Sequence, residues 1–229
     1  MAQHVVIVGY GTKGRSAIET LVSNGMSRND IVVVDPKSAA VREANDAGLT
    51  VVIGDATRRD VLRRAGTDKA RQVIITTDRD DSTVLSVLNA RQLNPSTYIV
   101  AAVREGENVN LVRQSGADAV VTSSDAVGRL LGLSAVSPAL GSVIEDLLST
   151  GHGLEVAERE LLVPEVGKQP QQMADQVLAV VRDEKVHRYF DPAVTQLARG
   201  DRLVVVRPSE ELPWAPRPGT HGEETTEDD

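Results

Sequence analysis

The chain has 229 residues, of which 41% are hydrophobic and 25% are charged, and its net charge is −8 at pH 7. This length allows one large domain, or a domain of about 140 residues with a smaller companion. The absence of cysteine excludes disulfides and thiolate metal sites and fits a cytoplasmic location, while the acidic balance without a basic stripe argues against nucleic acid as a partner.

The longest apolar runs are strand-sized, and none approaches the roughly 20 residues that cross a bilayer. The first residues lead straight into an apolar strand, so we expect neither a signal peptide nor a membrane span. The four histidines show no metal-ligand spacing and are expected at the surface; they are His4, His152, His187 and His221.

Strand-like runs alternate with helical patterns from the start of the chain. Helices are predicted over residues 14–24 and 80–93, where apolar side chains recur on one face. The expected strands are Val5–Val8, Ile31–Val34, Val51–Ile53, Gln72–Thr76, Tyr98–Ala101 and Ala119–Val121. Almost wholly apolar strands alternating with helices predict an α/β fold, a Rossmann-like doubly wound parallel sheet with helices on both faces.

Two further helices follow the sixth strand. One covers Ser124–Ala135, and the next begins at Ser137 and Pro138, a residue pair typical of an N-cap and first helical position. The second helix carries an apolar stripe of Leu140, Val143, Ile144, Leu147 and Leu148. This stripe packs either on the chain's own sheet or against a partner subunit.

A small α+β unit of about 55 residues is expected after a linker at 150–153. Its predicted strands are Leu154–Val163, Val177–Val181, Val186–Tyr189 and Leu203–Val206, with a helix over Gln171–Gln176. From Pro208 the chain is rich in proline and then in acids, which predicts a disordered tail. The expected division is therefore a Rossmann-like domain over 1–136, a helix and linker over 137–153, the small α+β domain over 154–207 and the tail over 208–229.

The stretch "VVIVGYGTKGRSA" places a Gly-x-Gly-x-x-Gly motif between a strand and a helix. In this context Gly9 permits a tight turn, Gly11 lets a pyrophosphate approach the backbone, and Gly14 lets helix and strand pack closely. Asp35 ends the second strand and can accept both ribose hydroxyls of an adenosine. An acid there disfavours the 2′-phosphate of NADP, although Lys37 keeps NADP open.

Two more loops fall at carboxyl ends of strands, where this fold binds ligands. Asp55-Ala56-Thr57 and Thr76-Thr77-Asp78 could line an adenine or phosphate site, cap the following helices, or do both. Arg104, after the fifth strand, either reaches a phosphate or pairs with a nearby acid. The candidate cofactor-binding residues are Gly9, Tyr10, Gly11, Thr12, Lys13, Gly14, Asp35, Pro36, Asp55, Ala56, Thr57, Thr76, Thr77, Asp78 and Arg104.

A small NAD-dependent oxidoreductase is the main alternative to a regulatory nucleotide-binding protein. Such an enzyme needs a proton donor or acceptor beside the nicotinamide. No Tyr-x-x-x-Lys occurs, and no buried-looking His–Asp pair suggests itself. We therefore expect no enzyme and no catalytic residue. A purely structural scaffold with an empty cleft is a third reading.

Several blocks together resemble the RCK (TrkA-N) domain of potassium channels and Trk/Ktr-type potassium transport systems. The blocks are "HVVIVGYGTKG", "VVVDP", "GDATRRDVLRRAG", "VIITTDRDDSTVLSVLNARQLNP" and "VAAVREGENVNLVRQSGADAVVTSS". The stretch "LAVVRDEKVHRYFDPAVTQLARGDRLVVVRP" is similar to the companion TrkA-C domain. The resemblance runs in order over about residues 4–207.

The resemblance implies a cytoplasmic gating domain whose copies pair into dimers and form an octameric ring, or a tetramer, on a membrane pore or transporter subunit. It implies adenine nucleotide ligands, NAD(H) or ADP/ATP, in the cleft of the candidate residues, and in some relatives cyclic di-AMP at the C-terminal domain. Some relatives have arginine directly after the second glycine of the motif, where this chain has Thr12 followed by Lys13, which weakens the case for ATP. Ala102 and Arg104 replace the glutamates of calcium-gated relatives, so no metal site is expected. The chain is either a separate subunit or a fragment of a channel.

Overall fold

The computed structural model describes residues 4–148 and 153–209, and the chain divides into two compact units, Met1–Val136 and Ser137–Asp229. Residues 150–152 of the predicted linker and the predicted disordered tail beyond Ser209 lie outside the described residues. Among the helices that the structure describes, none is long and apolar enough to cross a membrane.

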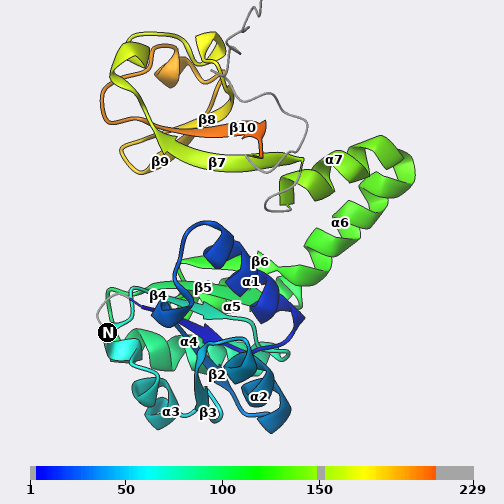
Figure 1. Ribbon diagram of the computed structural model, residues 1–229, viewed down its shortest axis with the longest axis vertical. Coiled ribbons are helices and arrows are strands. Elements are labelled where there is room, and N and C mark those ends of the chain that lie inside the picture. The colour runs from blue at the N-terminus through cyan, green and yellow to red at the C-terminus, as the bar shows by residue number, and fades with distance from the viewer. Residues whose placement is uncertain (1–3, 149–152, 210–229) are drawn as a thin grey trace, which may run out of the picture. The chain divides into compact units, whose positions relative to one another are not determined.

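The first unit contains a six-stranded parallel sheet in the order β3-β2-β1-β4-β5-β6 (Figure 1). The strands are β1 (Val5–Val8), β2 (Ile31–Asp35), β3 (Thr50–Ile53), β4 (Gln72–Ile75), β5 (Tyr98–Val103) and β6 (Ala119–Thr122). The strand order reverses between β1 and β4, and a doubly wound fold binds its ligands at such a reversal. The predicted fold class and the six predicted strands are confirmed.

Helices cover both faces of this sheet because successive side chains of a strand point to opposite sides. Val5 and Ile7 of β1 are fully buried with α1 (Thr12–Ser23) and α2 (Ser38–Asp46). Val6 and Val8 face the opposite core, under α3 (Arg59–Arg64), α4 (Asp80–Leu93) and α5 (Val109–Gln114). On the face covered by α1 and α2, part of β5 and β6 stays uncovered. An apolar hollow of about 260 Å³ lies there and is lined by residues that include Val100, Ala102 and Val121.

Helix α6 (Ser123–Val136) extends from β6 and closes the first unit. None of its residues is buried, although Val127, Leu131 and Val136 are large and apolar. The second unit begins with α7 (Pro138–Leu148), where the Ser137 hydroxyl accepts a hydrogen bond from the Leu140 N–H at 3.4 Å, as predicted for an N-cap. Both helices therefore present apolar side chains that their own unit does not bury.

The second unit contains a four-stranded antiparallel sheet in the order β7-β10-β8-β9. Its strands are β7 (Leu154–Glu160), β8 (Gln176–Arg182), β9 (Lys185–Arg188) and β10 (Arg202–Pro208). The predicted helix at Gln171–Gln176 is wrong. Only a short 3-10 turn forms at Pro170–Gln172, because Asp175 pairs with Arg159 at 2.7 Å and Gln176 already pairs with Val206 of β10. The predicted strand to Val163 is also too long, since β7 ends at Glu160.

His4 is not the surface residue that the sequence predicts. Its side chain is buried beneath the sheet at the start of β1, and Nε2 lies 3.0 Å from the Ala65 carbonyl oxygen. Gly66 follows in a left-handed turn (φ +74°), and a side chain there would press on the His4 ring. His4 therefore belongs to the packing that joins β1 to the loop before β4.

An ion pair between Arg182 and the buried carboxylate of Asp201 fixes the loop of the second unit between β9 and β10. Asp201 is 3% exposed, and both of its carboxylate oxygens accept hydrogen bonds from Arg182, at 2.8 and 2.7 Å. Arg182 also donates to the carbonyl oxygens of Ala193 and Gln196. Burial raises the pKa of Asp201, but the hydrogen bonds from Arg182 and from the Ala198 N–H outweigh it and leave the pKa below its usual value.

We predict that Asp201→Asn destabilises this unit by about 2 to 3 kcal/mol at pH 7, because Arg182 loses its charged partner. The lowered pKa means that the carboxylate stabilises the fold above about pH 4 and that this contribution disappears as the pH falls further. Asp201→Asn should therefore unfold with less pH dependence below pH 4 than the parent. Hydrogen exchange of β8 and β10 peptides measures both effects. Glu184→Gln, which alters an exposed pair with Arg202, is the control and should change stability little.

Candidate functional site

The turn between β1 and α1 is shaped by two glycines that have no room for a side chain. Gly9 adopts φ +95°, and a Cβ there would lie 3.0 Å from the Thr76 hydroxyl. A Cβ on Gly14 would overlap the carbonyl oxygen of Gly9. By contrast, nothing lies within 4 Å of the corresponding position on Gly11. The chain therefore folds back tightly on itself at Gly9 and Gly14 and leaves Gly11 open to an incoming group.

Thr76 ties the end of β4 to this turn. Its hydroxyl donates to the Val8 carbonyl oxygen at 2.9 Å, and its N–H donates to the same oxygen at 2.8 Å. Gly11 is the N-cap of α1 and offers no side-chain acceptor to the first helical N–H groups. Free N–H groups at a helix N-terminus favour an anion such as a phosphate.

Asp35, at the end of β2, is held in place by backbone donors on both sides. Its Oδ2 accepts from the Tyr10 N–H and its Oδ1 accepts from the Lys37 N–H, each at 2.8 Å. The side chain is 6% exposed, so its orientation is fixed. A carboxylate has about four acceptor positions, so these two bonds leave capacity for the hydroxyl groups of a ligand.

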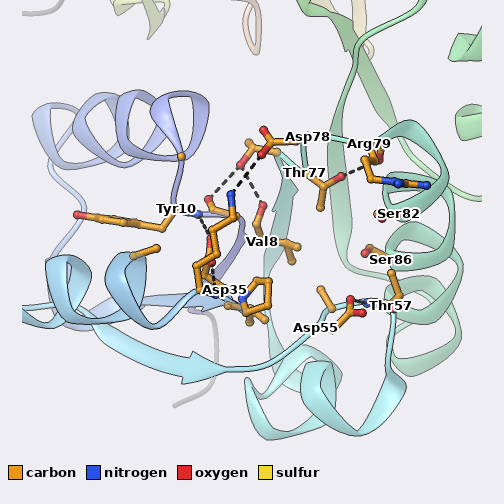
Figure 2. A pocket seen from close by; sticks show the side chains of 18 residues that line it. Val8, Tyr10, Asp35, Asp55, Thr57, Thr77, Asp78, Arg79, Ser82 and Ser86 are labelled. Atoms are coloured by element: carbon orange, nitrogen blue, oxygen red, sulfur yellow. Dashed lines mark hydrogen bonds and ion pairs between the residues drawn. The ribbon is translucent and has the colours of Figure 1, made fainter.

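A cavity of about 210 Å³ opens between these elements, above the point where the strand order reverses (Figure 2). The structure brings most of the predicted residues to its wall: Gly9, Tyr10, Gly11, Asp35, Pro36, Asp55, Ala56, Thr57, Thr76, Thr77 and Asp78. The Tyr10 ring points away from the cavity in Figure 2, so Tyr10 contributes its backbone while its ring packs in the core with Ile18.

Four predicted residues do not line this cavity. Gly14 lies behind the turn, and Thr12 belongs to the first turn of α1. Lys13 crosses to the next loop, where its Nζ donates to the Thr77 carbonyl oxygen at 3.1 Å. The Arg104 side chain is mostly exposed and lies 3.5 Å from Glu105, which is the ion-pair alternative. A phosphate contact by Arg104 stays a prediction.

The prediction that Asp55, Thr57 and Asp78 cap the helices after their loops is wrong. Asp55 Oδ1 accepts from the Thr57 N–H at 2.9 Å, which makes a local turn before α3, whose N-cap is Arg58. Arg79 is the N-cap of α4 and Asp78 does not cap it. The Asp78 carboxylate instead lies 3.8 Å from Lys37 Nζ across the cavity mouth.

Sequence reasoning missed four polar residues that line the cavity: Lys37, considered only for NADP, and Arg79, Ser82 and Ser86. Ser82 and Ser86 lie one turn apart on α4. The detectable signal is two small hydroxyl residues four apart on the helix that follows the Thr76-Thr77-Asp78 loop. That spacing places both on one helix face.

Asp80 fixes the neighbouring loop. Its carboxylate accepts from the Arg104 N–H at 2.8 Å, the Glu105 N–H at 3.1 Å and the Asn108 side-chain amide at 2.7 Å. Burial raises its pKa, but these donors outweigh burial and lower the pKa below its usual value. The start of α4 and the end of β5 are therefore held together by a charged acceptor.

The arrangement can hold a nucleotide. Amide groups of the turn and the α1 N-terminus suit phosphate, and Asp35 suits ribose. The remaining wall is small and partly apolar, including Ala56, which is 5% exposed. No group of three or more histidine, cysteine or acidic side chains that could hold a metal ion occurs in the part of the chain that the structure describes.

The family model for the TrkA-N domain matches residues 5–123. Potassium channel protein 1 of Methanocaldococcus jannaschii is 30% identical over 155 residues, which are 67% of this chain and 46% of that protein. The GsuK RCK domain is similar at 28% identity and a TM-score of 0.52, over 91% of this chain and 44% of that one. GsuK bound to ADP is 30% identical with a TM-score of 0.54, over 60% of this chain and 35% of that one. The chain thus spans less than half the length of these relatives.

We predict that Gly14→Ala and Gly11→Ala differ sharply in stability. The added methyl group at position 14 meets the Gly9 carbonyl, so the first unit should lose at least about 2 kcal/mol. At position 11 the backbone is extended and the space is open, so the change should stay within about 1 kcal/mol. Chemical denaturation followed by circular dichroism compares the two. Equal losses would contradict the close approach of the two backbones.

Proposed function

The chain belongs to the TrkA-N domain family, and from this premise we propose that it is a nucleotide-sensing regulatory domain of a potassium transport system. The observation that carries the proposal is the Asp35 carboxylate. It is buried, oriented by two backbone N–H groups and placed at the wall of a cavity beside the glycine turn. Adenine nucleotides are the proposed ligands, with NAD(H) and ADP/ATP as the candidates.

Two findings support an adenine nucleotide. An acidic residue at the end of the second strand of this fold binds ribose hydroxyls. A structure with 30% sequence identity over 60% of this chain is GsuK bound to ADP. This proposal includes all of the predicted ligand-binding residues. Four of them, Thr12, Lys13, Gly14 and Arg104, would need to act from outside the cavity wall.

We propose regulation rather than catalysis. The cavity wall has no histidine, the commonest general acid or base, and its tyrosine, Tyr10, turns its ring away from the cavity. A ligand regulates when it binds one arrangement of a protein better than another. A tenfold difference in affinity would supply about 1.4 kcal/mol per site, and several sites in one assembly would add.

The assembly is proposed to form between copies of this chain through α6 and α7. Helix α6 has 14 residues and buries none of its side chains, so it gains little stability from packing within its own unit. Its apolar side chains are therefore proposed to pack against a second copy of the chain. Val127 and Leu131 are one turn apart on α6 and are 57% and 67% exposed. A membrane pore or transporter subunit is the proposed larger partner and places the chain at the inner face of the membrane.

The second unit is proposed to be a TrkA-C domain over residues 154–207, joined through 137–153. The similarity to the GsuK RCK domain covers 91% of this chain, which is more than the first unit, Met1–Val136, can account for. Cyclic di-AMP binding by this unit stays a prediction.

We predict that Asp35→Ala weakens binding of AMP, ADP and NAD⁺ about tenfold or more, because hydrogen bonds from ribose hydroxyls to a charged acceptor are lost. Two N–H groups also lose their acceptor, so about 1 to 3 kcal/mol of stability should go too. Calorimetric titration below the melting temperature measures the affinities. Asp60→Ala, an exposed acid outside the cavity, is the control and should bind like the parent.

We predict that Val127→Asp with Leu131→Asp reduces self-association, since two charges would be buried at the proposed contact. Analytical ultracentrifugation of the chain should show a shift to smaller species. Val163→Asp changes another exposed apolar residue, in the second unit, and should leave the distribution unchanged. An unaltered distribution in the α6 variant would contradict pairing through this helix.

A further inference from the structure

We propose that Ser86 reads the edge of the nucleotide's base; this inference rests on the proposed function. Ser86 lies on α4 and, with Asp55, Thr57 and Ser82, lines one end of the cavity. We call these four residues the far end, because Figure 2 places them across the cavity from Asp35. If ribose lies at Asp35, the far end lies where the base of the same nucleotide must go.

The Ser86 hydroxyl is fully buried and has no hydrogen-bond partner in the structure. Serines within helices commonly donate to the carbonyl oxygen four residues earlier. Ser23 and Ser134 make this bond, at 2.9 and 2.8 Å. Ser86 does not, and its oxygen is directed into the cavity (Figure 2). A buried hydroxyl without a partner is unfavourable, so its position calls for a group that the ligand supplies.

The walls around this hydroxyl are fixed. Asn89, one turn further along α4, donates its side-chain amide to the Thr57 carbonyl oxygen at 2.7 Å. Thr57 donates its N–H to Asp55, so the loop after β3 is fastened both internally and to α4. The loop after β3 is therefore held in a fixed position against the helix that carries Ser86.

The chemistry of the far end fits a base better than a phosphate, since Arg79, the cation beside Ser82, already pairs with Asp81 at 2.6 Å. The Asp55 carboxylate repels a phosphate, whereas it can accept from an exocyclic amine. A hydroxyl can donate to a ring nitrogen or accept from an amine, so Ser86 can pair with either kind of base edge. A phosphate binds more favourably at the opposite end of the cavity, beside the open backbone at Gly11 and the N-terminus of α1.

Calorimetric titration with AMP tests the assignment. Ser86→Ala should weaken AMP binding about tenfold, the effect of one lost hydrogen bond of about 1.4 kcal/mol. The same variant should raise the melting temperature of the free protein, because a buried hydroxyl without a partner is removed. Ser86→Cys keeps the bulk but is a weak donor, so it should bind AMP nearly as poorly as Ser86→Ala.

Thr97→Val is the matched control. The Thr97 hydroxyl is also buried without a partner, but Thr97 is not part of the cavity wall. This variant should also raise the melting temperature and should leave AMP binding unchanged. If Ser86→Ala binds AMP as tightly as the parent, the inference is overturned and the proposed function stands. If the parent binds none of AMP, ADP, ATP and the NAD species, both fall.

Discussion

The site depends on one steric constraint, the contact between the Gly9 carbonyl and the α-carbon of Gly14. No side chain fits between them, so the chain must turn sharply out of β1 and enter α1 at once. That turn sets the Tyr10 N–H against the Asp35 carboxylate and leaves Gly11 open. The proposed acceptor for a ribose and the proposed donors for a phosphate are thereby placed side by side by the backbone.

The rest of the first unit supports this turn. Thr76 holds the ends of β1 and β4 together, and Asp80 holds the loop after β5 to the start of α4. Both anchors lie at the carboxyl edge of the sheet, and Thr76 lies at the point where the strand order reverses between β1 and β4. The cavity is therefore bounded by segments that are tied to one another through buried or charged acceptors. A ligand that prefers a slightly different spacing of these segments would shift β4, β5 and α4 together.

Much of the fold was predictable because strands buried on both faces must be apolar and because glycines mark turns where a side chain cannot fit. Asp35 was predictable for the same reason, since the end of the second strand adjoins the glycine turn. Other features depend on contacts that a linear pattern does not contain. His4 is buried only because the loop at Gly66 closes over it. Residues 171–176 read as helical, but Asp175 and Gln176 are recruited by Arg159 and by β10. Ser86 was missed because a serine within a helix is unremarkable until its hydroxyl proves to have no partner.

The central claim is that the cavity beside Gly9 and Asp35 senses an adenine nucleotide. The most direct test is thermal unfolding of the chain with NAD⁺, NADH, NADP⁺, AMP, ADP, ATP and cyclic di-AMP, each added alone. A ligand at about a hundred times its Kd stabilises the folded state by about 2.7 kcal/mol, which raises the melting temperature by several degrees. We predict such a rise with at least one adenine mononucleotide or NAD species and a smaller one with NADP⁺. An unchanged melting temperature across all seven at millimolar concentration would contradict the account.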